Sequence, residues 1–175
     1  LVYETFDINE TALTKIEVGH EDYDVFCPSE YIIERMLKKG LVQPIQKNLI
    51  ADSIWYFDNI SPFVTEKFQQ MAPSADIKVS DYTAGYMWGT TGFIYNPQFV
   101  NREDLKSWGA VLDPKFENRI LMKDAFRDVY SVLILYAYAD AIERGEVTRD
   151  ELVRDITPER VEAVKQVLLQ AKKQI

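Results

Sequence analysis

At 175 residues, with 47% hydrophobic and 27% charged residues, the chain has the size of one domain or two small lobes and the composition of a globular protein. Its longest apolar stretch, within residues 129–139, is far shorter than the roughly 20 residues that span a membrane. The net charge of -8 argues against a nucleic-acid surface and suits a cationic ligand, although an acidic balance also serves solubility alone.

The first 40 residues predict a helix, a strand and a second helix. Asn9 is expected to cap the first helix, which ends at Gly19, and a strand is expected over Tyr23–Cys27. Ser29 is expected to cap the second helix, which stops at Gly40. The apolar stripe of that helix consists of Ile32, Ile33, Met36 and Leu37.

The run YMWGTTGFIYN, residues 86–96, places an aromatic pair, a glycine-bracketed turn and a strand end to end. Gly89 and Gly92 permit backbone angles that their large neighbours cannot adopt, and the strand Phe93–Tyr95 is stopped by Pro97. The pattern predicts a hinge where the chain crosses between two lobes. A buried corner between two strands is the structural alternative.

The second half predicts another strand followed by helices. A short helix opens earlier at Ser61-Pro62, and the later strand covers Ile120–Met122. A long helix is expected from Asp124 to Arg144, closed by Gly145. Two further helices begin at Thr148 and at Thr157, the last with a core stripe of Val161, Val164, Val167 and Leu168.

Strands alternating with helices predict an α/β fold with a largely parallel sheet in each half. We expect lobe one over residues 1–85, a hinge over 86–91 and lobe two over 92–175. Small-molecule sites favour domain interfaces, so a cleft between the lobes is the expected place for a ligand.

The chain has few side chains that could pair as a nucleophile and a general base, so its sequence does not predict an enzyme. His20 is the one histidine, in a loop that is expected to be exposed, and Cys27 is the one cysteine, expected to be buried. No phosphate loop or nucleophile elbow occurs, and one cysteine excludes an internal disulfide and a multi-cysteine metal site. We therefore predict a binding protein without metal or cofactor.

Five stretches of the chain resemble the polyamine-binding proteins (spermidine/putrescine branch) of bacterial ABC importers, within the periplasmic solute-binding protein superfamily. They are YMWGTTGFIYN, YETFDINETALTKI, YDVFCPSEYIIERMLKKGLVQPI, SWGAVLDPKFENRILMKD and RDVY, in the family's order. The resemblance implies a two-lobed type II periplasmic-binding-protein-like fold, incomplete here because family members run to about twice this length. The start at Leu1 without a signal peptide also suggests an excised segment.

The same resemblance implies that the protein captures a polyamine in the interlobe cleft and delivers it to the membrane permease subunits of an ABC importer. The expected location is the periplasm or, with a lipid anchor, the outer cell surface. Ser29 by its hydroxyl and Tyr31 by its ring match family positions that contact the polyamine. Both follow the strand 23–27, and ligands of open α/β sheets bind beyond the carboxyl ends of strands.

In the second half, Asp128 matches an acidic family position that pairs with a ligand ammonium, and Arg127 matches a basic neighbour that holds this acid. The family often has another carboxylate three residues earlier, where this chain has Ala125, and Asp124 is the nearest substitute. Without the resemblance, Asp128 is only an acid in the first turn of a helix.

Trp88 and Tyr86 are further candidate ligand-binding residues because they could line the bottom of the cleft. Large aromatic residues at a chain crossing, however, more often pack against the core. Trp55 and Trp108 are expected to be structural. Three alternatives stay open: the same fold with another small charged solute, an enzyme that uses Asp124 and Asp128 as acids, and a fragment that binds nothing.

Overall fold

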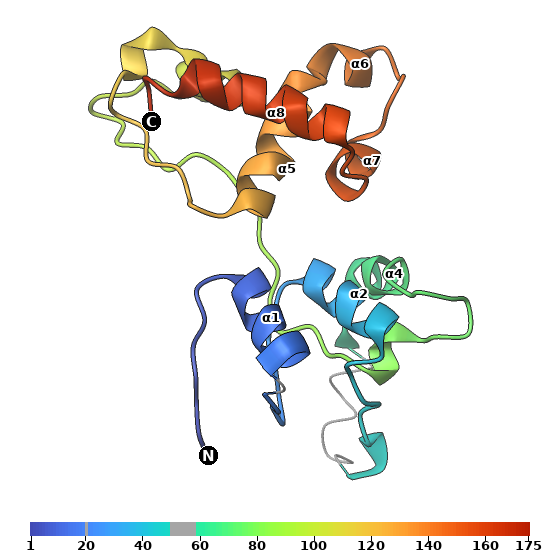
Figure 1. The fold of residues 1–175 in the computed structure, drawn as a ribbon. Coiled ribbons are helices and arrows are strands. Elements are labelled where there is room, and N and C mark those ends of the chain that lie inside the picture. The colour runs from blue at the N-terminus through green and yellow to red at the C-terminus, as the bar shows by residue number, and fades with distance from the viewer. Residues whose placement is uncertain (20, 50–58) are drawn as a thin grey trace. The chain divides into compact units, whose positions relative to one another are not determined.

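The computed structural model describes residues 1–19, 21–49 and 59–175, which divide between two units, Leu1–Gly89 and Thr90–Ile175. Figure 1 shows the helices of each unit. The expectations for His20 and Trp55 fall outside the described residues. The unit boundary lies within the segment 86–91 in which the hinge is predicted.

The unit Leu1–Gly89 is built on α1 (Asn9–Gly19), α2 (Glu30–Lys39) and α4 (Pro62–Gln69), with short 3-10 turns at Lys47–Leu49 and Val79–Asp81. α1 packs on α2 through Leu13, Ile32 and Met36, and a Lys39–Glu17 ion pair of 2.7 Å joins the same helices. A second cluster joins Leu37 to Met71 and Val79. The predicted stripe of α2 is confirmed as its inner face.

The unit Thr90–Ile175 contains four α-helices among its residues, all of which are described: α5 (Phe126–Ala137), α6 (Ala139–Glu143), α7 (Arg149–Arg154) and α8 (Pro158–Ala171). Short 3-10 turns cover Arg102–Leu105, Trp108–Leu112 and Pro114–Phe116. Both α7 and α8 pack against α5 (Figure 1). The buried core of this unit is Val111, Tyr130, Leu133, Ile134, Leu152, Val164, Val167 and Ala171.

The long helix expected over residues 124–144 is two helices, so that expectation is wrong in detail. The backbone of Tyr138, with φ -113° and ψ 20°, leaves the helical region and separates α5 from α6. Gly145 does end α6 as predicted, in the left-handed conformation with φ 71°, and its N–H donates to the carbonyl of Ile142 at 3.0 Å.

The predicted strands are not formed, and within the described residues the structure is helical, without the sheets of an α/β fold. Extended backbone becomes a strand only when a neighbouring strand supplies the ladder of hydrogen bonds. In the segment Ile120–Met122, the N–H of Ile120 instead donates to the carbonyl of Gln174 at 3.0 Å, beyond the end of α8. Segments Tyr23–Cys27 and Phe93–Tyr95 are likewise irregular.

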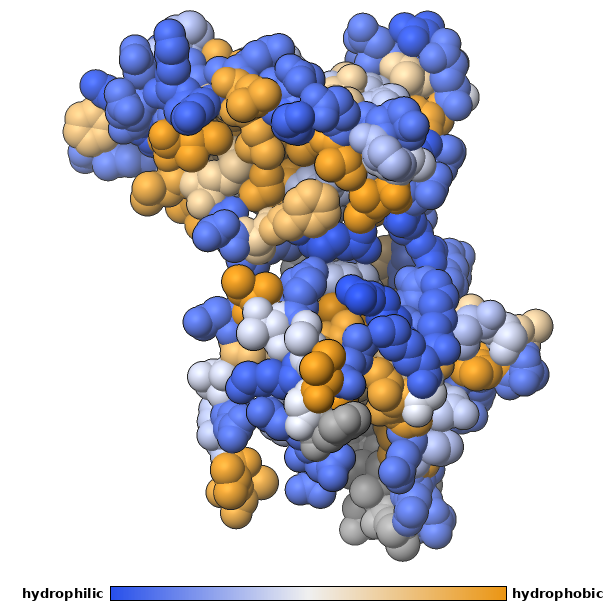
Figure 2. Space-filling model, viewed as in Figure 1, coloured by the Kyte–Doolittle hydropathy of each residue, from blue (hydrophilic) through white to orange (hydrophobic). Residues whose placement is uncertain are grey.

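The three segments expose side chains that a sheet would bury. Val25 is 86%, Ile94 103% and Leu121 101% exposed, whereas their neighbours Phe26 and Ile120 are partly buried. Strands that are buried on both faces of a sheet have continuous apolar sequences. In these three segments one row of side chains is exposed to solvent instead. Cys27 is also exposed, contrary to expectation, for the same reason. Figure 2 shows apolar side chains at the surface of both units.

The glycines of the predicted hinge do not adopt the backbone conformation on which that prediction partly rested. Positive φ occurs at Gly40 and Gly145 among the described glycines, and not at Gly89 or Gly92. A Cβ on either of the last two would meet no atom within 4 Å. The hinge over 86–91 therefore stays a prediction that rests on the resemblance.

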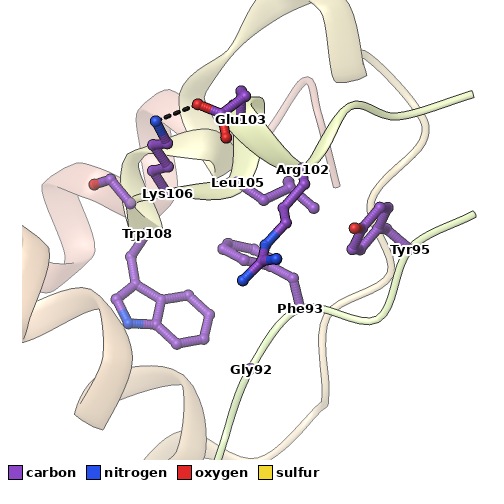
Figure 3. Close-up of a pocket in the computed structure, with 9 residues that line it drawn as sticks. Gly92, Phe93, Tyr95, Arg102, Glu103, Leu105, Lys106 and Trp108 are labelled. Carbon is purple, nitrogen blue, oxygen red and sulfur yellow. Dashed lines mark ion pairs between the residues drawn. The ribbon is translucent and has the colours of Figure 1, made fainter. Parts of the chain in front are cut away.

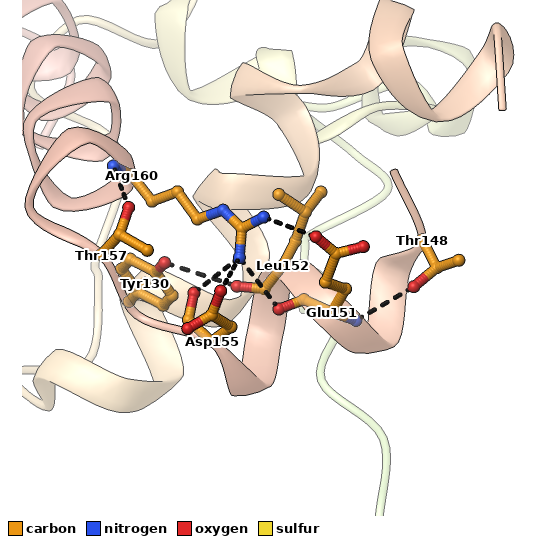
Figure 4. A network of polar contacts seen from close by, with 7 residues as sticks. All are labelled: Tyr130, Thr148, Glu151, Leu152, Asp155, Thr157 and Arg160. Carbon is orange, nitrogen blue, oxygen red and sulfur yellow. Dashed lines mark hydrogen bonds and ion pairs between the residues drawn. The ribbon is translucent and has the colours of Figure 1, made fainter. Parts of the chain in front are cut away.

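Arg160 of α8 is bonded to α7, and the Tyr130 hydroxyl of α5 donates to the Leu152 carbonyl of α7 at 3.4 Å (Figure 4). The Arg160 guanidinium, in a side chain only 14% exposed, donates to Glu151 Oε1 at 2.8 Å, to Asp155 Oδ2 at 3.0 Å and to the Asp155 carbonyl at 2.8 Å. The carbonyl lies at the end of α7, where backbone acceptors lack partners within the helix. The bond to Glu151 raises the pKa of Arg160 above its ordinary value.

We expect Arg160→Met to lower the thermal midpoint of the full chain by several degrees, because the two carboxylates and the end of α7 lose their donor. Arg149→Met is the matched control, since it makes the same change at an exposed position of α7. Thermal unfolding followed by circular dichroism measures both. Equal midpoints for the two variants would show that the network contributes nothing to stability.

Candidate functional site

Ser29 precedes α2 and is held by α1. It occupies the N-cap position, with φ -69° and ψ 157°, but its side chain does not cap the helix. Its Oγ instead accepts from Asn9 Nδ2 at 3.0 Å, and its N–H donates to Asn9 Oδ1 at 3.1 Å. The expected caps at Asn9 and Ser29 are therefore wrong, because the two polar side chains satisfy each other. A hydroxyl oxygen has two lone pairs, so one remains for a ligand N–H.

Tyr31 is held by the same turn of α1. Its ring packs against the cluster of Leu13, Ile32 and Met36, and its hydroxyl donates to Glu10 Oε1 at 3.0 Å. The predicted residues Ser29 and Tyr31 thus both bond to adjacent residues of α1. Sequence reasoning missed Asn9 and Glu10 in this role, since contacts between residues about 20 positions apart leave no local signal.

A second group of carboxylates lies in the same unit. The Tyr23 hydroxyl donates to Glu21 and, at 3.4 Å, to Glu4. The bond to Glu21, aided by partial desolvation and the charges of both carboxylates, raises the pKa of Tyr23 to about 12. Glu21 and Glu4 thus bond to one phenol of this unit, and Lys15 Nζ lies 4.0 Å from Glu21 Oε2.

The candidates of the other unit lie at the start of α5. The helix begins at Phe126 with Ala125 as its N-cap, so the expectation that Asp124 caps it is wrong. Alanine offers no oxygen to the first N–H groups of the helix. Asp124 is exposed just before this turn, and Arg127 and Asp128 are half-buried within it. α5 thus brings Arg127 and Asp128 together, with Asp124 beside them in sequence.

Asp128 is engaged by a cation that sequence reasoning did not consider. Lys123 Nζ forms an ion pair with Asp128 Oδ2, and the two side chains are 72% and 45% exposed. The Lys123 ammonium is therefore bound to the carboxylate that, by the resemblance, would bind the ammonium group of a ligand. The arrangement shows that this carboxylate accepts a primary ammonium at the surface. A lysine shortly before an acid in the first turn of a helix was the available signal.

Tyr86 and Trp88 are solvent-exposed, at 78% and 75%. The packing role that large aromatics commonly serve at a chain crossing is therefore not seen for them within their unit. Trp108, in contrast, packs on Phe93 with ring centroids 4.6 Å apart, as expected of a structural aromatic.

The hollow shown in Figure 3 does not coincide with the predicted site residues. It measures about 580 Å³ in the Thr90–Ile175 unit, between Phe93, Trp108 and Tyr95. Two cations, Arg102 and Lys106, reach it, and Lys106 pairs with Glu103 at its rim. Cationic walls suit an amine poorly, so the chemistry of the first turn of α5 is the better match for a cationic ligand.

Two other classes of site find no support in the described parts of the chain. No cluster of three or more histidine, cysteine or acidic side chains is placed to hold a metal ion there. Among the helices of the same residues, none has both the length and the apolar composition needed to cross a lipid bilayer.

Comparison with known proteins identifies the class of protein to which this chain belongs. Residues 21–173 match the family model of bacterial extracellular solute-binding proteins, which covers most of the chain. The chain belongs to that family. No solved structure matches it significantly.

Several curated relatives share about the same segment. The spermidine/putrescine-binding periplasmic protein of Salmonella typhimurium is 27% identical over 77% of this chain and 36% of its own length. The putrescine-binding periplasmic protein PotF of Escherichia coli is 28% identical over 80% of this chain and 38% of its own. A putrescine/agmatine-binding protein of Pseudomonas aeruginosa is 30% identical over 69% and 32%. The chain thus spans about a third of the length of these relatives.

We expect Ala125→Ser to raise the free energy of unfolding by about 0.5–2 kcal/mol, because a serine hydroxyl accepts from the uncapped first turn of α5. Ala163→Ser, the same change inside α8, is the control and should be neutral or slightly destabilising. Urea unfolding of the full chain measures both. If Ala125→Ser did not raise the free energy of unfolding, the assignment of residue 125 as the N-cap would be contradicted.

Proposed function

We propose that this chain is part of an extracytoplasmic solute-binding protein that captures a polyamine and delivers it to the permease of an ABC importer. The observation that carries the proposal is the Lys123 ammonium on Asp128, at the position that matches the family's ligand-binding acid. The curated relatives support it, since their names specify spermidine, putrescine or agmatine and the periplasm. A periplasmic or lipid-anchored location belongs to the same proposal.

Each unit supplies groups that an alkyl amine needs. In Leu1–Gly89 these are the Ser29 hydroxyl and the Tyr31 ring, with Tyr86 and Trp88 as exposed aromatic faces for methylene groups. In Thr90–Ile175 the acid is Asp128, with Asp124 and Arg127 beside it. The two-lobed α/β fold of the family is also part of the proposal. In it, Tyr23–Cys27, Phe93–Tyr95 and Ile120–Met122 pair as strands in the full-length protein, and residues 86–91 form the hinge.

No catalytic step is proposed. The relatives are named as binding proteins, and the partner that the structure gives Asp128 is the Lys123 ammonium. Release of the bound amine by denaturation, followed by mass spectrometry, should return it chemically unchanged. A converted amine would favour the alternative of an enzyme on the same scaffold.

A zwitterionic solute is the second candidate, favoured by the balanced charges before and within α5. Lys123 and Arg127 are cationic and Asp124 and Asp128 anionic, while the second family carboxylate is replaced by Ala125. A four-carbon ligand series separates the candidates: putrescine is a dication, 4-aminobutyrate a zwitterion and butane-1,4-diol neutral. Tighter binding of 4-aminobutyrate than of putrescine would select the second candidate.

We expect calorimetry on the full-length protein to detect putrescine or spermidine binding and no butane-1,4-diol binding. Asp128→Asn should weaken amine affinity about tenfold or more, because a charge-assisted hydrogen bond is lost. Lys123→Met should strengthen it by a few-fold at most, since an exposed ion pair is worth roughly 0–1 kcal/mol. Lys165→Met, which breaks the Lys165–Glu162 pair within α8, is the control for net charge.

Amine binding that Asp128→Asn leaves intact would place the ligand elsewhere. Lack of binding by every amine would overturn the polyamine proposal as a whole.

We expect Ala125→Asp to tighten amine binding several-fold, because it restores a second carboxylate beside the first turn of α5. Ala125→Ser separates this effect from helix capping, since serine caps the helix without adding charge. The same calorimetric titration measures both variants. Equal gains from aspartate and serine would show that capping, and not charge, is responsible.

A further inference from the structure

Glu10 lies at the first turn of α1 and is bound to a candidate ligand residue. Its Oε1 accepts from the Tyr31 hydroxyl at 3.0 Å. The adjacent Asn9 forms two hydrogen bonds with Ser29, at 3.0 and 3.1 Å. One turn of α1 therefore bonds both residues that the resemblance assigns to the ligand in this unit, Tyr31 through the Glu10 carboxylate and Ser29 through Asn9.

The carboxylate of Glu10 differs from that of Asp128 in its charge balance. Asp128 is neutralised by Lys123, whereas the ion pairs found within the described residues include none on Glu10. Glu10 is exposed, and its hydrogen bond comes from a neutral phenol. A carboxylate with one oxygen bonded to a neutral donor keeps its full negative charge and further lone pairs for a cation.

The groups around Glu10 match the needs of a primary ammonium, which donates three hydrogen bonds. Glu10 supplies a charged acceptor, and the Tyr31 hydroxyl, which donates to Glu10 at 3.0 Å, orients its carboxylate. The packing of the Tyr31 ring on Leu13 and Ile32 holds the phenol in place.

We propose that Glu10 is a ligand-binding residue, the carboxylate that receives an ammonium group of the solute in the Leu1–Gly89 unit, with Tyr31 as its orienting partner. This inference rests on the proposed capture of an amine. It assigns to this unit the acid that the resemblance did not provide. It also gives the Tyr31 hydroxyl, and not only its ring, a part in binding.

Calorimetry with putrescine on the full-length protein tests the role of Glu10. Glu10→Gln keeps an oxygen that accepts from Tyr31 but removes the charge, and should weaken putrescine binding about tenfold or more. It should also reduce the dependence of affinity on salt, because one charge pair is gone. Tyr31→Phe should cost less, since the ring and the carboxylate both stay.

Glu66→Gln is the matched control, an exposed acid of α4 in the same unit with the same change of net charge. Its affinity and salt dependence should stay close to those of the unmodified protein. Thermal midpoints check that both variants are folded. A Glu10→Gln protein that binds putrescine as tightly as the control overturns the role of Glu10 and leaves the polyamine proposal standing. Failure of the unmodified protein to bind any amine overturns both.

Discussion

Burial of α5 is the constraint on which the candidate site of the Thr90–Ile175 unit depends. Tyr130, Leu133 and Ile134 have no exposed surface and pack against α7 and α8. Each such side chain contributes roughly 1.5–3 kcal/mol, more than the 0–1 kcal/mol of an exposed ion pair. Packing two residues beyond Asp128, and not the bond to Lys123, therefore sets where this carboxylate lies. The lysine can leave without moving the acid.

Most of the helices could be predicted from the sequence because their signals are local, although the break at Tyr138 and the true start of α5 were not. The stripe of α2, the proline at the start of α4 and the caps at Thr148 and Thr157 all act within one or two turns. The strands could not, since each depends on a ladder with a distant segment. Their apolar pattern is real, and Val25, Ile94 and Leu121 remain exposed without those partners.

The candidate site shows the same division between local and distant information. Ser29, Tyr31 and Asp128 are predicted by the resemblance and by their places at segment ends. The bonds from Asn9 and Glu10 join residues 20 and 21 positions apart, and no pattern along the chain announces them. Lys123 was within reach of sequence reasoning, because it precedes Asp128 by less than two turns. The partners that set the charge balance around these candidate residues were what the sequence did not reveal.

The most direct test of the account is a crystal structure of the full-length protein with putrescine. The account predicts an amine nitrogen within hydrogen-bonding distance of the Asp128 carboxylate, with the Lys123 ammonium displaced from it. Putrescine bound elsewhere, with the Lys123–Asp128 pair intact, would contradict the claim that this carboxylate is the acid that captures the solute.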